Sequence, residues 1–269
     1  MTPNPPHSIE AEERFEIQRH NELYDRQRPQ ELGIMTPWDW ERFDQILERT
    51  DPYIESVRRL GDLRGKRVFD VGCGSGWLSI ILAKRGALVD GMDISPEAVR
   101  TAELRSARNG VGDQCRFRAG SCYELPYEDG RFEVVAGQSI LHHVGDKARA
   151  AAELFRVMRP SAHAVFHEPF GNSLMMERLR RLVPVPSGSP DDPEQWSHQF
   201  KYSDLPPFRA HFEVEIEEFQ FFSRLDRVIR SPKVRLALGR FDRALLAKVG
   251  FLRQYARAIV IVLRKPPAR

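Results

Sequence analysis

The sequence predicts a doubly wound α/β fold in which helices cover both faces of a seven-stranded sheet. Short apolar runs alternate with amphipathic stretches from residue 67 to about 168, which is typical of repeated strand–helix units. The first apolar run leads into a glycine-rich turn, and two further strand-like runs, 212–222 and 255–264, follow near the C-terminus. Five strands from the alternating region and two closing strands make up the expected sheet.

Composition is consistent with one domain that carries a local insertion. The chain has 269 residues, 41% of them hydrophobic, which is enough for one sizeable core. Its 41 basic and 38 acidic residues leave a net charge of +3, which by itself indicates neither a nucleic-acid partner nor a membrane partner. Three cysteines without metal-ligand spacing predict no disulfide framework and no metal site. The first residues contain no apolar run, so we expect a cytoplasmic protein.

The core elements follow from local signals. Ser95 is a candidate N-cap, because Pro96 suits the first helical position and Glu97 suits the positive end of the helix dipole. A later helix begins near Asp146 and ends before Pro160, which cannot continue it. The expected helices are 77–84, 95–108 and 146–159, and the expected strands are 67–71, 87–92, 115–119, 132–137 and 162–167.

The segments outside this core are given separate roles. Residues 1–60 are expected to form an N-terminal helical cap, 61–170 the core, 171–210 an irregular lid or substrate segment, and 211–269 closing strands with a basic helical insertion. That insertion, 224–248, alternates apolar residues with Arg and Lys. We expect a packed helix pair with a solvated basic face, and attachment to a membrane surface is the alternative.

The glycine-rich turn carries the sharpest functional signal. Glycines at alternate positions let the backbone approach a ligand closely. Dinucleotide-binding folds also place such a turn after their first strand, but their fingerprint requires glycine where Trp77 stands. Asp70, just before the turn, would repel a diphosphate and attract an ammonium group. The motif is Asp70-Val71-Gly72-Cys73-Gly74-Ser75-Gly76-Trp77.

A second acid strengthens this interpretation. Asp93 ends the second expected strand, where a carboxylate can accept two hydrogen bonds from a ribose diol.

Four segments together resemble the successive motifs of the class I S-adenosylmethionine-dependent methyltransferases, in particular the small-molecule, type 11-like members, which have a Rossmann-like fold. They are residues 70–77, 93–95, 125–126 and 140–144. In that family the first loop holds the methionine part of S-adenosylmethionine, the acid after the second strand binds the ribose, and the turn after the third strand lines the adenine. Many members have an acid where Ser121 stands, and a serine oxygen can still accept a hydrogen bond. The resemblance implies S-adenosylmethionine as cofactor and S-adenosylhomocysteine as product, held by Asp70, Gly72, Cys73, Gly74, Gly76, Trp77, Asp93, Ile94, Ser121, Cys122 and Gln138.

Histidines at the same sheet edge predict how the acceptor loses its proton. His142 and His143 follow the fourth strand, and Glu168 ends the fifth. A neutral imidazole can take a proton from a hydroxyl while a carboxylate orients the ring. The alternative is that one histidine packs under the loop and the other caps the next helix. Residues proposed to contact the acceptor, with plain packing as the alternative, are Tyr24, Trp38, His167, His198 and Tyr202.

The leading hypothesis is O-methylation of a small metabolite, glycan or lipid-linked intermediate. N-methylation is the second hypothesis within the same class of enzyme. A module that binds S-adenosylmethionine without turnover and docks on a partner through residues 224–248 is a hypothesis of another class, and a nicotinamide dehydrogenase is a third. Nucleic acid is not expected as a substrate, because Gln138-Ser139-Ile140 stands where an Asn-Pro-Pro-Tyr type signature would be.

Overall fold

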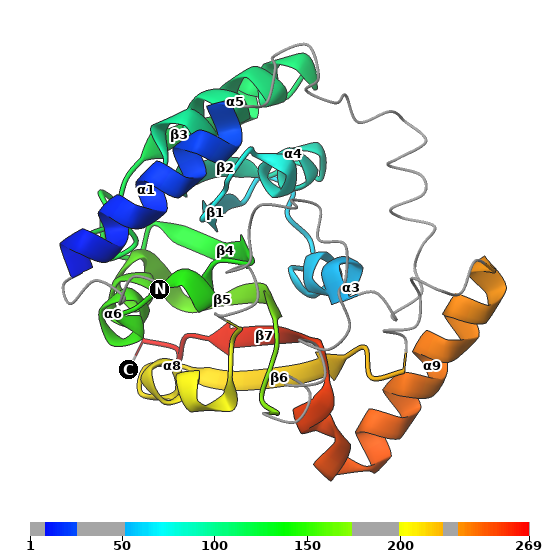
Figure 1. Ribbon diagram of the computed structural model, residues 1–269. Coiled ribbons are helices and arrows are strands. Elements are labelled where there is room, and N and C mark those ends of the chain that lie inside the picture. The colour runs from blue at the N-terminus through cyan, green and yellow to red at the C-terminus, as the bar shows by residue number, and fades with distance from the viewer. Residues whose placement is uncertain (1–8, 26–51, 174–198, 223–230, 269) are drawn as a thin grey trace, which may run out of the picture.

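The computed structural model describes residues 9–25, 52–173, 199–222 and 231–268. These residues contain one seven-stranded sheet in the order β3-β2-β1-β4-β5-β7-β6 (Figure 1). The strands from β3 to β5 are parallel, whereas β7 is antiparallel to both of its neighbours. The predicted doubly wound, Rossmann-like fold is therefore confirmed, and its strand order reverses between β1 and β4.

The strand bounds agree closely with the alternation of apolar residues. The first and third strands have the predicted bounds, β2 is shifted by one residue at both ends, and β4 extends one residue beyond its predicted end. The strands are β1 (Arg67–Val71), β2 (Leu88–Asp93), β3 (Cys115–Ala119), β4 (Phe132–Gln138), β5 (Met158–Pro169), β6 (Glu213–Phe219) and β7 (Ala258–Arg264).

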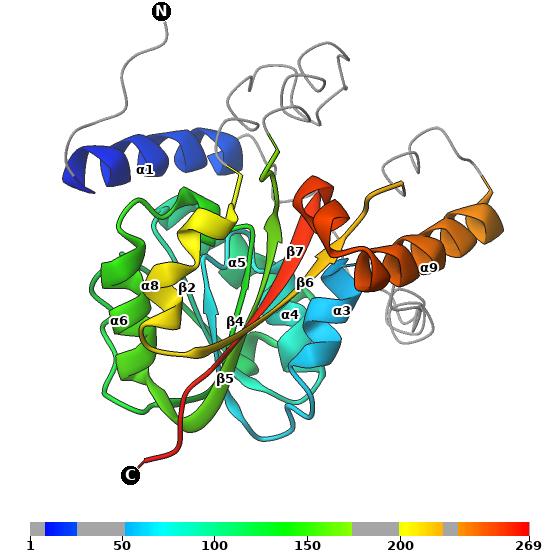
Figure 2. The same ribbon diagram turned by 90° about the horizontal axis from the view of Figure 1, so that it is seen from below.

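Helices cover both faces of the sheet, because successive strand residues point to opposite sides. Figure 2 shows α6 and α8 on one face and α3 and α4 on the other. Phe69 of β1 lies in the core on the first side with Phe132, while its neighbour Val68 packs on the second side. The α-helices are α1 (Ile9–Asp25), α3 (Pro52–Arg59), α4 (Trp77–Lys84), α5 (Pro96–Arg108), α6 (Lys147–Val157), α8 (Pro206–Arg209) and α9 (Pro232–Lys248).

Two helix starts confirm the capping signals. The Ser95 hydroxyl accepts from the backbone N–H of Ala98 at 3.1 Å, with Pro96 at the first helical position of α5. The Asp146 carboxylate accepts from the N–H of Arg149 at 3.0 Å and caps α6. Each cap satisfies a donor that would otherwise lack an intrahelical partner, so the sequence fixes where both helices begin.

Three elements differ from the prediction. The strand β5 begins at Met158 and not at residue 162, because its pairing with β4 continues past an irregularity near Pro160, where Ser161 has φ 62°. Residues 199–210 are not irregular: they include the 3-10 helix η4 (Tyr202–Asp204) and α8, whose Phe208 is fully buried. Burial of that aromatic side chain outweighs the local preference of a proline-rich segment. Within 224–248 the described part is the single helix α9.

The helix α9 packs on β6, which is the edge strand of the sheet. Arg243 of α9 forms an ion pair with Glu217 of β6 at 2.7 Å, and the buried Asp242 accepts from the N–H of Phe222 at 2.9 Å. One side of α9 therefore packs against β6 and pairs with an acidic residue of that strand. No helix in the described ranges is long and apolar enough to cross a membrane.

The helix α1 lies across the end of the sheet toward which the parallel strands point, as Figures 1 and 2 show. Two contacts attach it to the core. The Ser95 hydroxyl donates to Asn21 Oδ1 at 2.6 Å, and the Ser121 hydroxyl forms a short hydrogen bond with Glu13. A helix from the N-terminal segment therefore closes one side of the region where the sequence places the site.

Candidate functional site

A cavity of about 290 Å³ lies at the carboxyl ends of β1, β2, β3 and β4. This is the edge at which ligands bind in open α/β sheets, beside the reversal of strand order. The walls include the loops that leave those strands and three residues of α1. Of the predicted site residues, those that line it are Asp70, Gly72, Cys73, Gly74, Trp77, Asp93, Ile94, Cys122, Gln138 and His143.

The glycine turn between β1 and α4 brings the backbone to the cavity wall. Gly72 has φ 67°, and a Cβ at this position would lie 2.6 Å from Cγ1 of Ile140. Gly76 has φ 82°, and a Cβ there would lie 2.9 Å from the Cβ of Ala102. Both positions combine a left-handed backbone with a close approach, so side chains are excluded on two grounds. Gly76 does not line the cavity; its lack of a side chain lets the turn pack closely against Ala102 of α5.

Asp70 is fully buried at the end of β1 and lines the cavity. Its Oδ2 accepts from the Ser79 hydroxyl at 2.5 Å, while its Oδ1 has no hydrogen-bond partner among the described residues. Burial raises the pKa of this carboxyl to about 7, the hydrogen bond from Ser79 opposes the rise, and the nearby Asp93 adds to it. A buried acceptor with an open lone pair fits a cationic ligand group.

Asp93 has two backbone partners at the end of β2. Its Oδ2 accepts from the N–H of Gly74 at 2.8 Å, and its Oδ1 accepts from the N–H of Ser95 at 3.0 Å. The carboxylate therefore ties the glycine turn to the start of α5. A carboxylate has about four acceptor positions, so two remain for ligand hydroxyls.

The turn after β3 forms the next part of the wall. Gly120, Cys122 and Tyr123 line the cavity. Ser121 does not: its hydroxyl contacts Glu13 of α1 and accepts from the N–H of Tyr123 at 3.1 Å. Glu13 lines the cavity itself, so α1 places a carboxylate next to the position at which the sequence has serine.

The Glu168 carboxylate, fully buried on β5, organises the loop after β4. It accepts from the backbone N–H groups of Ile140 and Leu141, each at 2.9 Å. Its Oε2 lies 2.6 Å from Nδ1 of His142, whose side chain is only 7% exposed. His142 and Glu168 thus form a pair beneath the 3-10 helix η3 (Leu141–His143), and neither lines the cavity.

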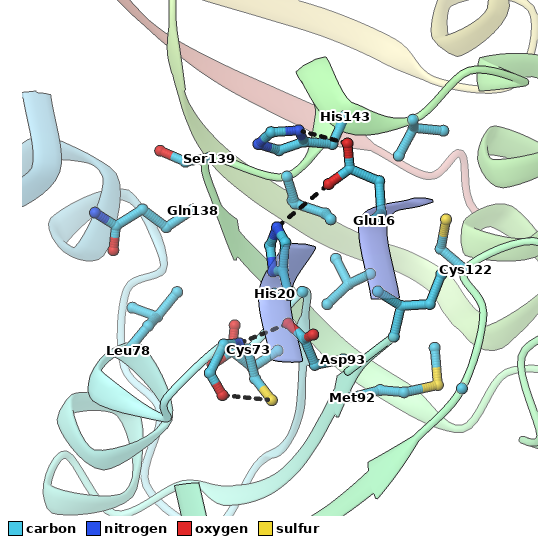
Figure 3. A pocket seen from close by; sticks show the side chains of 18 of the residues that line it. Glu16, His20, Cys73, Leu78, Met92, Asp93, Cys122, Gln138, Ser139 and His143 are labelled. Atoms are coloured by element: carbon cyan, nitrogen blue, oxygen red, sulfur yellow. Dashed lines mark hydrogen bonds and ion pairs between the residues drawn. The ribbon is translucent and has the colours of Figure 1, made fainter. Parts of the chain in front are cut away.

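His143 points the other way and lines the cavity together with two residues of α1, Glu16 and His20. Figure 3 shows the Glu16 carboxylate between the two imidazoles. Its Oε1 lies 3.7 Å from Nδ1 of His143, and its Oε2 lies 3.3 Å from Nε2 of His20. Burial lowers the pKa of His143; Glu16 opposes this effect, and His142, with its ring 4.0 Å away, adds to it. The lowered pKa favours a neutral His143 imidazole at physiological pH.

Other predicted residues lie elsewhere or outside the described part of the chain. The His167 ring lies 6.3 Å from that of Tyr53 in α3, on the face of the sheet opposite Glu168. The Tyr202 hydroxyl donates to Glu218 at 2.6 Å and its ring packs on Phe170. Neither lines the cavity. Tyr24 belongs to α1, while Trp38 and His198 lie outside the described residues.

Glu13, Glu16 and His20 were not predicted as site residues. The available signal was their spacing: positions i, i+3 and i+7 place three polar side chains on one face of the predicted N-terminal helix. That face is polar, so apolar periodicity gave no reason to place it against the core. Only the tertiary packing of α1 shows that the face closes a cavity.

The cavity is acidic. Four carboxylates line it, on Glu13, Glu16, Asp70 and Asp93, and its lining within the described ranges includes neither Lys nor Arg. Such a site attracts a ligand that carries positive charge and disfavours an anion such as a diphosphate.

Comparison with known proteins agrees with this geometry. Residues 69–166 match the model of a family described as a methyltransferase domain. A ubiquinone biosynthesis O-methyltransferase of Ralstonia nicotianae is 35% identical over 130 residues, 48% of this chain and 54% of the relative. A norajmaline N-methyltransferase of Rauvolfia serpentina is 35% identical over 101 residues, 37% of this chain and 35% of the relative.

The chain thus spans about half the length of the curated O-methyltransferases that it matches. Among solved structures, a geranyl diphosphate methyltransferase in complex with GPP and sinefungin superposes with a TM-score of 0.55 and 15% identity. The match covers 78% of this chain and 75% of that one, and it supports the fold.

Proposed function

The chain carries a class I S-adenosylmethionine-dependent methyltransferase domain, and on this premise we propose that it transfers a methyl group from S-adenosylmethionine to a hydroxyl of a small molecule. The observation that carries the proposal is the cavity at the sheet edge, which joins an acidic cofactor side at Asp70 and Asp93 to a neutral base at His143. Both halves are required for transfer to a hydroxyl.

The chain's own residues fit the cofactor. The open Oδ1 of Asp70 would accept from its ammonium group, and the free acceptor positions of Asp93 would take the ribose hydroxyls. The turn at Gly120 and Cys122 would face the adenine, with Glu13 behind Ser121. When bound, S-adenosylmethionine supplies an electrophilic methyl group on a sulfonium.

His143 would act on the acceptor. Its neutral imidazole takes the hydroxyl proton as the oxygen attacks, while the departing sulfide requires no acid. A base of lowered pKa matches an acidic hydroxyl best, and a phenolic hydroxyl, with a pKa of about 10, is much closer to it than an alkyl alcohol. We therefore favour a phenolic acceptor that carries no negative charge near the site, given the four carboxylates.

N-methylation is the second candidate, and the similarity to an N-methyltransferase over 101 residues favours it. An amine attacks through its own lone pair after it loses a proton to solvent. In that case His143 would contribute shape and not proton transfer.

Matched acceptors distinguish these two functions. We expect methyl transfer from labelled S-adenosylmethionine to 4-methylcatechol, and little transfer to 4-methyl-1,2-phenylenediamine, which has amines in place of both hydroxyls. His143→Gln should lower the rate of transfer to the hydroxyls by roughly 10²–10⁴-fold. If the diamine is methylated in preference to the catechol, and His143→Gln leaves that rate unchanged, the proposed acceptor atom is nitrogen and not oxygen.

A further inference from the structure

The contacts around Glu16 set it apart from the other acids of the cavity. One oxygen, Oε2, is approached by Nε2 of His20 at 3.3 Å and by Nη1 of Arg19 at 3.6 Å, both on α1. The other oxygen, Oε1, faces Nδ1 of His143 (Figure 3). Two cationic or polar groups of the same helix therefore lie within ion-pair distance of Oε2, although this oxygen accepts no hydrogen bond from the described residues, and the remaining oxygen is directed at the proposed base.

We propose that Glu16, paired on α1 with His20 and Arg19, is the positioning residue of the base His143, so that helix α1 forms part of the catalytic machinery. This inference rests on the proposed hydroxyl transfer. With the Nδ1 proton directed to Glu16, Nε2 of His143 keeps the lone pair that accepts the acceptor's proton. When the imidazole becomes an imidazolium, the carboxylate stabilises the new charge and stays ionised.

The alternative orienting acid, Glu168, is excluded by its contacts. Glu168 is engaged by Nδ1 of His142 and by backbone N–H groups of the loop, beneath η3. It reaches His143 only through the His142 ring, which lies 4.0 Å from the His143 ring. Two Glu–His pairs therefore occur side by side. Glu168 pairs with His142 beneath the loop, and Glu16 pairs with His143 at the cavity wall.

The anchoring of α1 explains how a peripheral helix can hold such a geometry. Glu13, one turn before Glu16, bonds to Ser121 after β3, and Asn21, just after His20, bonds to the cap Ser95 of α5. The two anchors flank Glu16 and His20 on the helix. At 3.7 Å the contact with His143 is longer than a hydrogen bond, and catalytic contacts of this kind tighten when substrates bind.

The titratable groups that face His143 are Glu16 and His20 from α1 and His142 from η3. Burial would raise the pKa of Glu16, but its contacts with His143 and His20 outweigh burial and lower it, so the carboxylate is ionised at neutral pH. During transfer, the acceptor O–H bond breaks and an N–H bond forms at Nε2 of His143. That proton then passes to solvent, and Glu16 is unchanged over the cycle.

Titration of the histidine ring signals by NMR in the full chain tests the pairing without turnover. The His143 signal is assigned from its loss in His143→Gln. We expect Glu16→Gln to lower the pKa of His143 by about one unit, the scale of losing an adjacent opposite charge, and Glu16→Asp to lower it less. Glu10→Gln is the matched control, because Glu10 lies on the same helix but is exposed and pairs with Arg14. A His143 titration that is identical in Glu16→Gln and Glu10→Gln overturns the inference.

Transfer to 4-methylcatechol provides the second readout. In Glu16→Gln we expect kcat to fall roughly 10–100-fold with little change in the acceptor KM, and the acidic limb of the pH–rate profile to move to lower pH. Glu16→Asp should recover part of the rate. An unmoved acidic limb overturns the inference, whereas absence of transfer by the unaltered chain, with the NMR shift present, overturns the proposed function.

Discussion

Asp70 illustrates, at the scale of one residue, how a binding site costs stability. Its carboxyl is buried with one open acceptor, and burial raises its pKa from 3.8 to about 7. In the unfolded chain the group ionises at its ordinary pKa. The native state therefore binds more protons between about pH 4 and 7, and this group's contribution to stability declines as pH rises through that window.

Asp70→Asn should separate binding from stability. At pH 8 the free variant should be more stable than the unaltered chain by up to about 4 kcal/mol, the ionisation penalty that this pKa rise represents. Its affinity for S-adenosylmethionine should fall, because an amide holds an ammonium group less well than a carboxylate does. Urea unfolding and calorimetry measure the two effects. Loss of stability in the free variant would show that the buried carboxylate is satisfied.

The two adjacent histidines should respond differently to the same substitution. His143→Gln should lower the transfer rate by roughly 10²–10⁴-fold and leave stability nearly unchanged. His142→Gln removes the partner of the buried Glu168 and should cost about 1–3 kcal/mol of stability with a smaller effect on rate. Unfolding midpoints and initial rates for both variants check this. The reverse pattern would assign the base to His142.

At the scale of elements, the turn between β1 and α4 is the part that the sequence predicts best. Asp70, the glycines and Asp93 follow from local pattern, because strand ends and tight turns are set by neighbours in the chain. The position of β5 was predicted less well, since its start depends on pairing with β4. A helical cap was expected from residues 1–60, but the place of Glu16 beside His143 was not predicted, because the two residues are distant in sequence and only packing brings them together.

Gly72→Ala tests whether the turn needs glycine for space or only for its backbone angle. We expect a loss of stability of about 1–3 kcal/mol and weaker cofactor binding, because the new Cβ would meet Ile140. Gly110→Ala is the matched control: its φ of 69° is nearly the same, but nothing lies within 4 Å of the added Cβ. Equal stability losses in the two variants would mean that the backbone angle alone matters.

At the scale of the whole molecule, the fold and the cavity residues at the strand ends could be predicted from the sequence, whereas the cavity residues from peripheral segments could not. Tyr202 and His167 lie away from the cavity, and Glu16, the carboxylate that faces His143, comes from α1. Strand ends in a parallel sheet converge on one edge by topology. Side chains from peripheral segments reach that edge only through tertiary packing.

The most direct test of the central claim is calorimetric titration of the full chain with S-adenosylmethionine at pH 7, in two buffers of different ionisation enthalpy, with NADH as the comparison ligand. We expect S-adenosylmethionine to bind and NADH not to bind, given the four carboxylates of the cavity. Binding should release protons, because Asp70, whose pKa burial raises to about 7, would become ionised beside the ammonium group. Binding of NADH in preference to S-adenosylmethionine, or binding of neither ligand, would contradict the account.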